Sequence, residues 1–179
     1  MIVTISGLHG TGKSTVGKIL SEKLGLKYYS TGQAFRDLAQ EKDMSLKQFT
    51  RYVENHPEID LELDDKIIDV ASKGDVIIDS QLSGFLLRDL ADFKILFTCP
   101  IEIRIKRMAD RDNSSVEEKM NETVAREKSE LKRFKKLYNI NLENSEKNRQ
   151  IFDLIIDTET LSAHEVVEKI ISAINKKFR

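Results

Sequence analysis

The sequence contains one cysteine, Cys99, and no long apolar run. A single cysteine excludes an intramolecular disulfide, and its place at the end of the apolar run at 95–97 predicts a buried thiol in a reducing cytoplasm. No window reaches the ~18 apolar residues that a membrane span requires, and the first residues lack the basic and apolar regions of a secretion signal. We therefore expect a cytoplasmic protein without a membrane partner.

Neither sign of charge is in excess. The chain has 29 lysines and arginines, 30 acidic residues and a net charge of −1, which excludes a general electrostatic attraction to nucleic acid. It also lacks internal repeats, low-complexity tracts and linkers. A chain of 179 residues suits one domain, whose hydrophobic core is large enough to be stable without disulfide bonds or structural metal ions. We expect a single domain that acts as a monomer.

Short apolar runs alternate with helical patterns along the chain. Strands are predicted at residues 2–6, 27–29, 75–79, 94–98 and 151–157. Helices are predicted at 12–24, 101–111, 115–137 and from 162 onward, with two or three more between 35 and 72 and a polar loop at 139–149. Because each strand is apolar throughout, we expect an α/β fold, with a five-stranded parallel sheet flanked by helices and ligands at the carboxyl ends of the strands.

The most specific local motif lies between the first strand and the first helix. It has the P-loop spacing G-x-x-x-x-G-K-[ST] in the segment Gly7, Leu8, His9, Gly10, Thr11, Gly12, Lys13, Ser14 and Thr15. Such a turn directs several N–H groups and a positive helix end at one anion, so we expect it to bind the phosphates of ATP. Lys13 is placed to reach the β- and γ-phosphates and Ser14 to ligate Mg²⁺. A turn that only connects a strand to a helix would need neither residue.

Two further segments follow strands and offer phosphate or metal contacts. Thr31, Gly32, Phe35 and Arg36 begin a helix after the second strand, where Arg36 could bind an anionic acceptor through its two-pronged guanidinium. The alternative is that Arg36 only pairs with the neighbouring acids at 37 and 41. Asp79 ends the third strand, where a carboxylate can reach Mg²⁺ or, as the alternative, cap a helix.

Arginines gather on both sides of a break at 112–115. Arg104, Arg107 and Arg111 precede it, and Arg126 and Arg133 follow it, seven positions apart and therefore on one helical face. Phosphoryl transfer needs positive charge over the γ-phosphate, and a helical hairpin that closes there would also exclude water. We interpret this hairpin as a lid. The lysines of the same helix alternate with Glu127 and Glu130 and predict a solvated face, at Lys128, Lys132, Lys135 and Lys136.

The order of these motifs resembles the nucleoside monophosphate kinases, and most closely the archaeal-type cytidylate kinases. The resemblance covers nearly the whole chain; its most specific part is R-E-K-S-E-L-K-R at 126–133, which leads into Tyr138, Asn139 and Ile140. It implies a P-loop kinase fold with a core at 1–30, 73–106 and 134–179. It also implies a helical arm at about 31–72 that binds the monophosphate, and a lid at about 107–133.

The resemblance further implies roles for individual residues. Those that bind ATP are residues 7–15 with Arg107 and Arg111. Those that bind the acceptor are Thr31, Gly32, Phe35, Arg36, Gln81, Gly84, Arg126 and Arg133. The catalytic candidates are Lys13, Arg107, Arg126 and Arg133, and the metal ligands are Ser14 and Asp79. The chain departs from the family pattern at Gln33 and at Ser80 and Gln81, where the family usually has a glycine–arginine pair. A glutamine should hold a phosphate ~1–2 kcal/mol less strongly than an arginine.

We therefore expect ATP, with Mg²⁺, to phosphorylate a nucleoside monophosphate, with CMP and dCMP as first choices. One alternative is another small P-loop kinase, acting on AMP, UMP or a non-nucleotide alcohol. The other is an ATP-dependent module that binds nucleic acid through the basic helix. The near-neutral net charge and the lack of aromatic interleaving in that helix argue against this last alternative.

Overall fold

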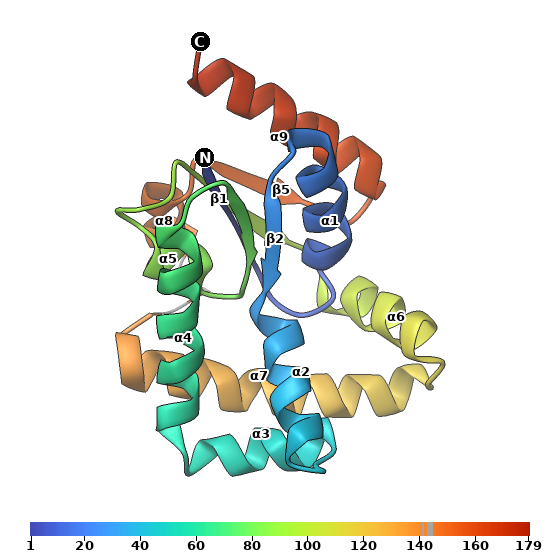
Figure 1. Ribbon diagram of the computed structural model, residues 1–179. Helices are drawn as coiled ribbons and strands as arrows, with labels where there is room; N and C mark the ends of the chain where they lie inside the picture. The colour runs from blue at the N-terminus through green and yellow to red at the C-terminus, as the bar shows by residue number, and fades with distance from the viewer. Residues whose placement is uncertain (141, 143–144) are drawn as a thin grey trace.

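Five parallel strands form one sheet, as predicted; numbered along the chain, they lie in the order 2-3-1-4-5. The computed structural model describes residues 1–140, 142 and 145–179. The strands are β1 Ile2–Ser6, β2 Lys27–Ser30, β3 Val76–Asp79, β4 Phe93–Thr98 and β5 Leu154–Asp157. Because β1 is the central strand, the P-loop that follows it lies in the middle of the carboxyl edge of the sheet (Figure 1).

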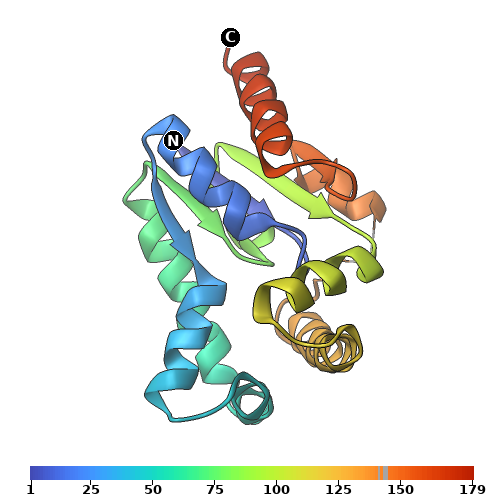
Figure 2. The ribbon, with the colours of Figure 1, turned by 90° about the vertical axis from the view of Figure 1, so that its right-hand side faces the viewer.

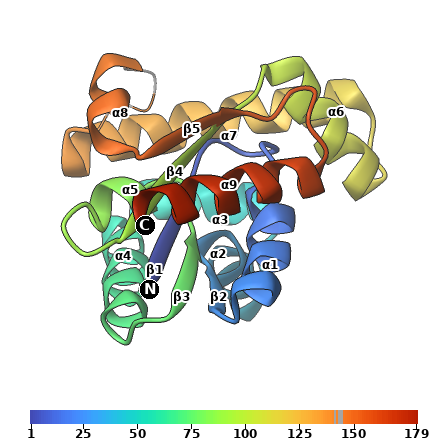
Figure 3. The same ribbon diagram turned by 90° about the horizontal axis from the view of Figure 1, so that it is seen from above.

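Helices cover both faces of the sheet. The helices on one face are α1 Lys13–Leu24 and α9 Ala163–Lys177, and those on the other are α4 Pro57–Ser72 and the short α5 Ser83–Leu86. In β3 the side chain of Ile77 packs with the α1 and α9 side, whereas Val76 and Ile78 pack with α4. Figure 3 shows β1 and β3 between α1 and α4. Coverage on both faces explains why the strands are apolar throughout rather than alternating.

The segment between β2 and β3 forms a separate helical arm. It contains α2 Thr31–Glu41, α3 Leu46–Glu54 and the first half of α4, and its own small core is built around Phe35, Phe49 and Val53. Ser45 caps α3 with a complete capping box, and Pro57 occupies the first turn of α4. The arm extends beyond the carboxyl edge of the sheet (Figures 1 and 2).

Two helices form the region predicted as the lid. α6 Ile101–Asp112 ends at Asn113, which has a positive φ of 51°, and α7 Val116–Tyr138 begins after a capping box at Ser115. Residues 107 and 133, the predicted lid boundaries, lie inside α6 and α7 rather than at breaks. α7 runs across the carboxyl side of the sheet toward the arm (Figure 1).

The end of the chain differs from the prediction in one segment. The predicted polar loop at 139–149 overlaps a helix, α8 Ser145–Ile151, while residues 141, 143 and 144 lie outside the described part of the chain. The last strand therefore begins at Leu154 and not at Ile151, which ends α8. The predicted cap of α9 at Ser162 is confirmed, again with a full capping box. Cys99, predicted to be buried, is only half-buried. Among the described residues, we find no helix with the length and apolar character needed to span a membrane.

Gly84 lies in the short helix α5 that follows β3 and packs directly against an aromatic ring. A Cβ atom at this position would lie 2.2 Å from Cε1 of Phe152, which is itself buried. We expect Gly84→Ala to lower the free energy of unfolding by about 1–3 kcal/mol, because overpacking forces a buried ring to shift. Chemical denaturation measures the change.

Gly32→Ala is the matched control for that substitution. Its nearest neighbouring atom would be 3.7 Å away, within ordinary contact distance, and Gly32 lies in α2. Alanine should leave the stability unchanged or raise it slightly, because glycine weakens a helix. Equal stability of the Gly84 variant and the wild type would contradict the close packing against Phe152.

Candidate active site

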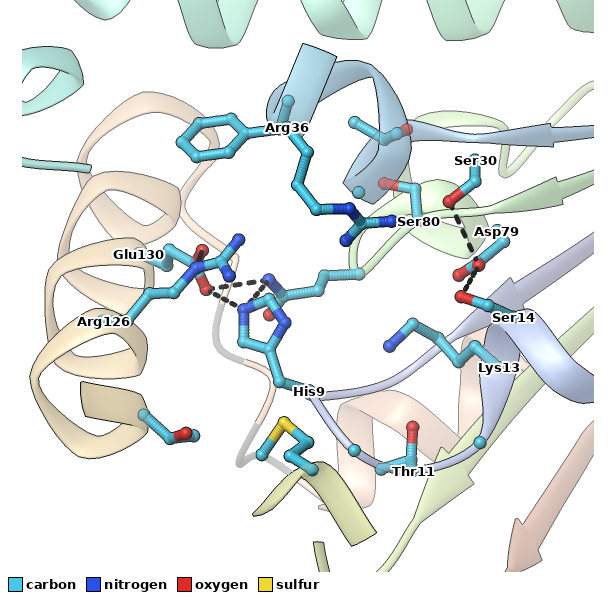
Figure 4. Close-up of a pocket in the computed structure, with 18 of the residues that line it drawn as sticks. His9, Thr11, Lys13, Ser14, Ser30, Arg36, Asp79, Ser80, Arg126 and Glu130 are labelled. Atoms are coloured by element: carbon cyan, nitrogen blue, oxygen red, sulfur yellow. Dashed lines mark hydrogen bonds and ion pairs between the residues drawn. The ribbon is translucent and has the colours of Figure 1, made fainter. Parts of the chain in front are cut away.

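One cavity of about 600 Å³ lies at the carboxyl edge of the sheet, between the P-loop, the arm and the lid region (Figure 4). Its size is typical of a small-molecule site. The predicted site residues that line it are His9, Gly10, Thr11, Gly12, Lys13, Ser14, Thr15, Thr31, Gly32, Phe35, Arg36, Asp79, Gln81, Arg107, Arg111, Arg126 and Arg133. The structure therefore brings together residues from four separate parts of the chain.

Three predicted site residues do not line this cavity. Gly7 packs against the backbone of Phe97, and Gly84 packs against Phe152. The carbonyl of Leu8 accepts hydrogen bonds from the hydroxyl of Thr11 and the ammonium of Lys13, both at 2.9 Å. Gly7 and Leu8 thus help to fix the conformation of the P-loop without lining the cavity, and Gly84 packs against Phe152 outside the cavity.

The P-loop conformation depends on glycine at two positions. Gly10 has a φ of +76°, and a Cβ atom there would lie 2.7 Å from the carbonyl oxygen of Arg104 on α6. Gly12, with a φ of +91°, is the N-cap of α1 and has no side chain to bond the first N–H groups of the helix. The first-turn N–H groups of a helix lack intrahelical partners, and here they adjoin the cavity. The site therefore has the backbone donors that an anion needs.

Lys13 projects into the cavity beside these donors (Figure 4). Its Nζ donates to the carbonyl oxygen of Leu8 at 2.9 Å. Burial lowers the pKa of Lys13, although Asp79 and the glutamates of α7 oppose the shift. A desolvated ammonium bonded to a neutral carbonyl gains more from an anion than a solvated one does.

Asp79, at the end of β3, accepts hydrogen bonds from three hydroxyl groups. Its Oδ2 accepts from Ser14 at 2.6 Å, Tyr28 at 2.7 Å and Ser30 at 3.3 Å. The donors are hydroxyls rather than the N–H groups of a helix, so this arrangement does not match the alternative role of Asp79 as a cap. Burial raises the pKa of the Tyr28 hydroxyl, and the neighbouring carboxylate adds to the shift.

The Ser14 and Asp79 oxygens suit a hard cation such as Mg²⁺. Within the described residues, no three His, Cys, Asp or Glu side chains are grouped as a metal site. At nucleotide sites, Mg²⁺ usually takes one or two protein oxygens and completes its shell with phosphates and water.

A buried ion pair joins the two lid helices to the P-loop. Arg104 on α6 donates to both oxygens of Glu127 on α7, at 2.5 and 3.2 Å, and to the carbonyl oxygen of His9 at 2.8 Å. Both side chains are at most 9% exposed. The prediction that Glu127 belongs to a solvated face was therefore wrong. The four lysines of that face are exposed, as predicted.

A second buried carboxylate on α7, Glu130, was also wrongly assigned to the solvated face. Its Oε2 lies 2.7 Å from Nε2 of His9 and accepts from Nε2 of Gln81 at 2.8 Å, while its Oε1 accepts from Nε of Arg126 at 2.8 Å (Figure 4). Burial lowers the pKa of His9, although the charge of Glu130 and its hydrogen bond oppose the shift. Burial also acts to raise the pKa of Glu130, but His9, Arg126 and Gln81 outweigh it and keep this carboxyl ionised.

Arg36, Arg111 and Arg126 approach one another across the cavity. Burial lowers the pKa of Arg36, and the charges of Arg111 and Arg126 lower it further. Arg36 donates to the amide oxygen of Gln33 at 2.8 Å, and among the described residues it forms no ion pair with the acids at 37 and 41. Arg111 bonds its neighbour Asp112. An anion in this cavity would relieve the repulsion between the three guanidinium groups.

The other two predicted arginines are fixed to opposite ends of the cavity. Arg107 donates to the hydroxyl and carbonyl of Thr158, at 3.2 and 2.6 Å, in the loop after β5. Arg133 donates to Asp60 on α4 at 2.7 Å, and both residues are buried. Arg126 and Arg133 share a face of α7, as predicted, but they contact different helices of the arm. Arg133 reaches Asp60 on α4, whereas Arg126 lies over the ring of Phe35 on α2, with its Cζ 5.4 Å from the centroid.

Sequence patterns did not indicate most of the groups that bond the predicted arginines and Asp79, or the two carboxylates of α4 in the cavity. The missed residues are Tyr28, Ser30, Asp60, Asp64, Glu127, Glu130 and Thr158, while Arg104 was singled out without a partner. The only local signal for Asp60 and Asp64 is their spacing of four positions, which places both on one face of a helix. Nothing local indicates which residues they meet.

Comparisons with known proteins agree with this geometry. The family described as AAA domain matches residues 3–135. The cytidylate kinase of Aeropyrum pernix is 42% identical over 97% of this chain and 98% of its own length. That of Methanocaldococcus jannaschii is 36% identical over 98% of both chains.

Solved structures show the same fold at much lower identity. The shikimate kinase from Acinetobacter baumannii aligns with a TM-score of 0.62 at 16% identity, over 98% of this chain and 93% of that one. A gluconokinase from Sinorhizobium meliloti aligns with a TM-score of 0.56 at 12% identity, over 97% and 91%. These two structures establish the fold alone. The nearly full-length match to the curated relatives shows more: the chain belongs to the cytidylate kinase family.

Proposed function

We propose that this protein transfers the γ-phosphoryl group of ATP to CMP or dCMP. The observation that carries the proposal is the single cavity in which the P-loop, the arm arginine Arg36 and the lid-region arginine Arg126 meet. Nearly full-length relatives that are named cytidylate kinases support the choice of acceptor. The arginines face inward to this cavity, an arrangement that favours a small nucleotide over a nucleic acid strand.

The donor phosphates would occupy the P-loop. There the first-turn N–H groups of α1 bind phosphate oxygens, and Lys13 exchanges the carbonyl of Leu8 for an anionic partner. Arg107 and Arg111 line the same cavity and complete the donor side. Mg²⁺, held through Ser14 and Asp79, would supply a charge that neutralises the transferring phosphoryl group.

The acceptor phosphate would bind between Arg36 and Arg126. Both guanidinium groups point into the cavity (Figure 4). A monophosphate is already an anion at neutral pH, so its oxygen attacks without a general base. The protein's contribution is then alignment of the two phosphates and stabilisation of the developing charge. α7 forms one wall of the cavity and reduces access of water, which would otherwise compete as the acceptor.

We expect Lys13→Ala to lower phosphoryl transfer at least ~10²-fold, because one preorganised electrostatic donor is lost from the site. Its stability should stay close to that of the wild type, since the substitution removes a desolvated charge. An assay coupled to ADP release, over CMP, dCMP, UMP and AMP, measures both the rate and the acceptor preference.

Lys18→Ala provides the control for the Lys13 variant. Lys18 is exposed on the same helix and does not line the cavity, so its removal should leave turnover unchanged. Near-normal turnover of a folded Lys13 variant would refute the P-loop mechanism. A wild type that phosphorylates none of the four monophosphates would refute the proposed function itself.

A separate prediction concerns the role of Arg126 in binding the acceptor phosphate. Arg126→Ala should lower transfer to CMP by ~10²-fold. It should lower acceptor-free ATP hydrolysis much less, because Arg126 lies at the acceptor side of the cavity, over Phe35. Steady-state ADP release with and without CMP separates the two reactions.

Lys128→Ala, exposed on the same helix, is the control for the Arg126 variant and should change neither reaction. Arg133→Ala is unsuitable here because it would remove the donor that holds the buried Asp60, whereas Glu130 still contacts His9 and Gln81 when Arg126 is replaced. If Arg126→Ala reduced both reactions equally, the acceptor role of Arg126 would be wrong.

A further inference from the structure

The arm end of the cavity holds two carboxylates that phosphate binding does not use. Asp60 and Asp64 stand one helical turn apart on α4, and both line the cavity. A carboxylate repels a phosphate, so these two side chains mark a part of the cavity that phosphate avoids. The P-loop, Arg36 and Arg126, which we assign to the phosphates, line other parts of the cavity. The Asp60 and Asp64 end is therefore left for the uncharged part of an acceptor.

Each carboxylate is held in place by one donor from α7. Arg133 donates to Oδ2 of Asp60 at 2.7 Å, and the hydroxyl of Tyr138 donates to Oδ2 of Asp64. An ionised carboxylate accepts at about four lone-pair sites, so one donor leaves each group able to accept more hydrogen bonds. The two carboxylates are therefore oriented by the fold and remain acceptors.

Apolar side chains form the walls beside these carboxylates. Leu46 of α3, Leu63 of α4 and Phe134 of α7 line the same cavity. Leu63 lies between Asp60 and Asp64 on α4 and is buried. Apolar walls with a few convergent polar groups are typical of a site for a flat ring whose edge carries hydrogen-bonding atoms.

Building on the proposed function, we propose that Asp60 and Asp64 select the acceptor base by accepting hydrogen bonds from the exocyclic amino group of cytosine. Uracil has a carbonyl oxygen at that position, which would face the carboxylate oxygens with no proton between them. A site built to pair with a donor strongly disfavours a ligand that lacks it. Adenine also carries an amino group. The carboxylates therefore distinguish bases with an exocyclic amino group from bases with a carbonyl oxygen at that position, and the spacing of the apolar walls distinguishes pyrimidines from the larger purines.

The electrostatics of Asp64 agree with this role. Burial raises its pKa to about 6, against the hydrogen bond from Tyr138, and the charges of Asp60 and Asp65 act in the same direction as burial. Burial also raises the pKa of Asp60, against its contact with Arg133. N–H donors from a ligand would occupy the remaining acceptor sites of these carboxylates and so offset the cost of burying them.

Asp64→Asn tests the proposal with an isosteric change. The amide offers one N–H donor and one oxygen acceptor, which complement the O4 and N3–H of uracil. We expect the ratio of kcat/KM for CMP to that for UMP to fall by roughly 10–100-fold. Turnover of UMP should rise in absolute terms, an outcome that a merely structural defect would not produce.

Asp65→Asn is the matched control, because it makes the same chemical change on the same helix. Asp65 is exposed and does not line the cavity, so the ratio should stay within about twofold of the wild type. Thermal unfolding of both variants shows whether they fold.

A ligand-side experiment on the wild type decides the matter even if Asp64→Asn does not fold. The monophosphate of 2-pyrimidinone riboside lacks only the amino group, and its kcat/KM should be roughly 10–100-fold below that of CMP. In folded Asp64→Asn that difference should shrink. Equal turnover of the analogue and CMP by the wild type, or an unchanged CMP-to-UMP ratio in the folded variant, would overturn the inference. Either result would leave the proposed function intact, provided that the wild type still phosphorylates CMP.

Discussion

The buried ion pair between Arg104 and Glu127 holds α7 against the P-loop, and the shape of the cavity depends on it. Removing both charges from water costs several kcal/mol for each ion, and their attraction offsets this cost only in good geometry with further hydrogen bonds. Arg104 supplies such a bond through the carbonyl of His9. A shift of α7 along its axis would leave one charge buried alone. The pair therefore specifies a single placement of α7, and the residues on its inner face are positioned with it.

That placement distributes charge unevenly along the cavity. Arg126 and Arg133 on α7 have carboxylate partners, in Glu130 and Asp60. Lys13 and Arg36, in contrast, donate to the oxygens of neutral groups, a backbone carbonyl and a glutamine amide. Exchanging a neutral acceptor for a phosphate oxygen gains a charge-assisted hydrogen bond without separating an existing ion pair. The cations most ready to bind phosphate are thus Lys13 at the donor side and Arg36 at the acceptor side.

Features decided by neighbouring residues could be predicted from the sequence, whereas features decided by distant partners could not. The P-loop and the capping box at Ser115 depend on residues a few positions apart, and the structure has both helix starts where they were predicted. Glu127 and Glu130 were assigned to water because a charged helix usually faces it, but the residues they bond lie 23 and 121 positions away. The start of β5 was misplaced for another reason. An apolar residue such as Ile151 fits the end of a helix as well as the beginning of a buried strand.

Gln81 shows how a departure from the family pattern changes meaning once the fold is known. From the sequence alone, its amide is a weak substitute for an arginine at the acceptor phosphate. In the structure that amide donates to Glu130 and lies beside the imidazole of His9, with the two nitrogens 3.1 Å apart. The other carboxylate oxygen of Glu130 accepts a hydrogen bond from Arg126. A second guanidinium at position 81 would compete with Arg126 for the same carboxylate and add to the repulsion that already acts on Arg36. In this arrangement the glutamine positions α7, and the charge that an acceptor phosphate requires comes from Arg36 and Arg126.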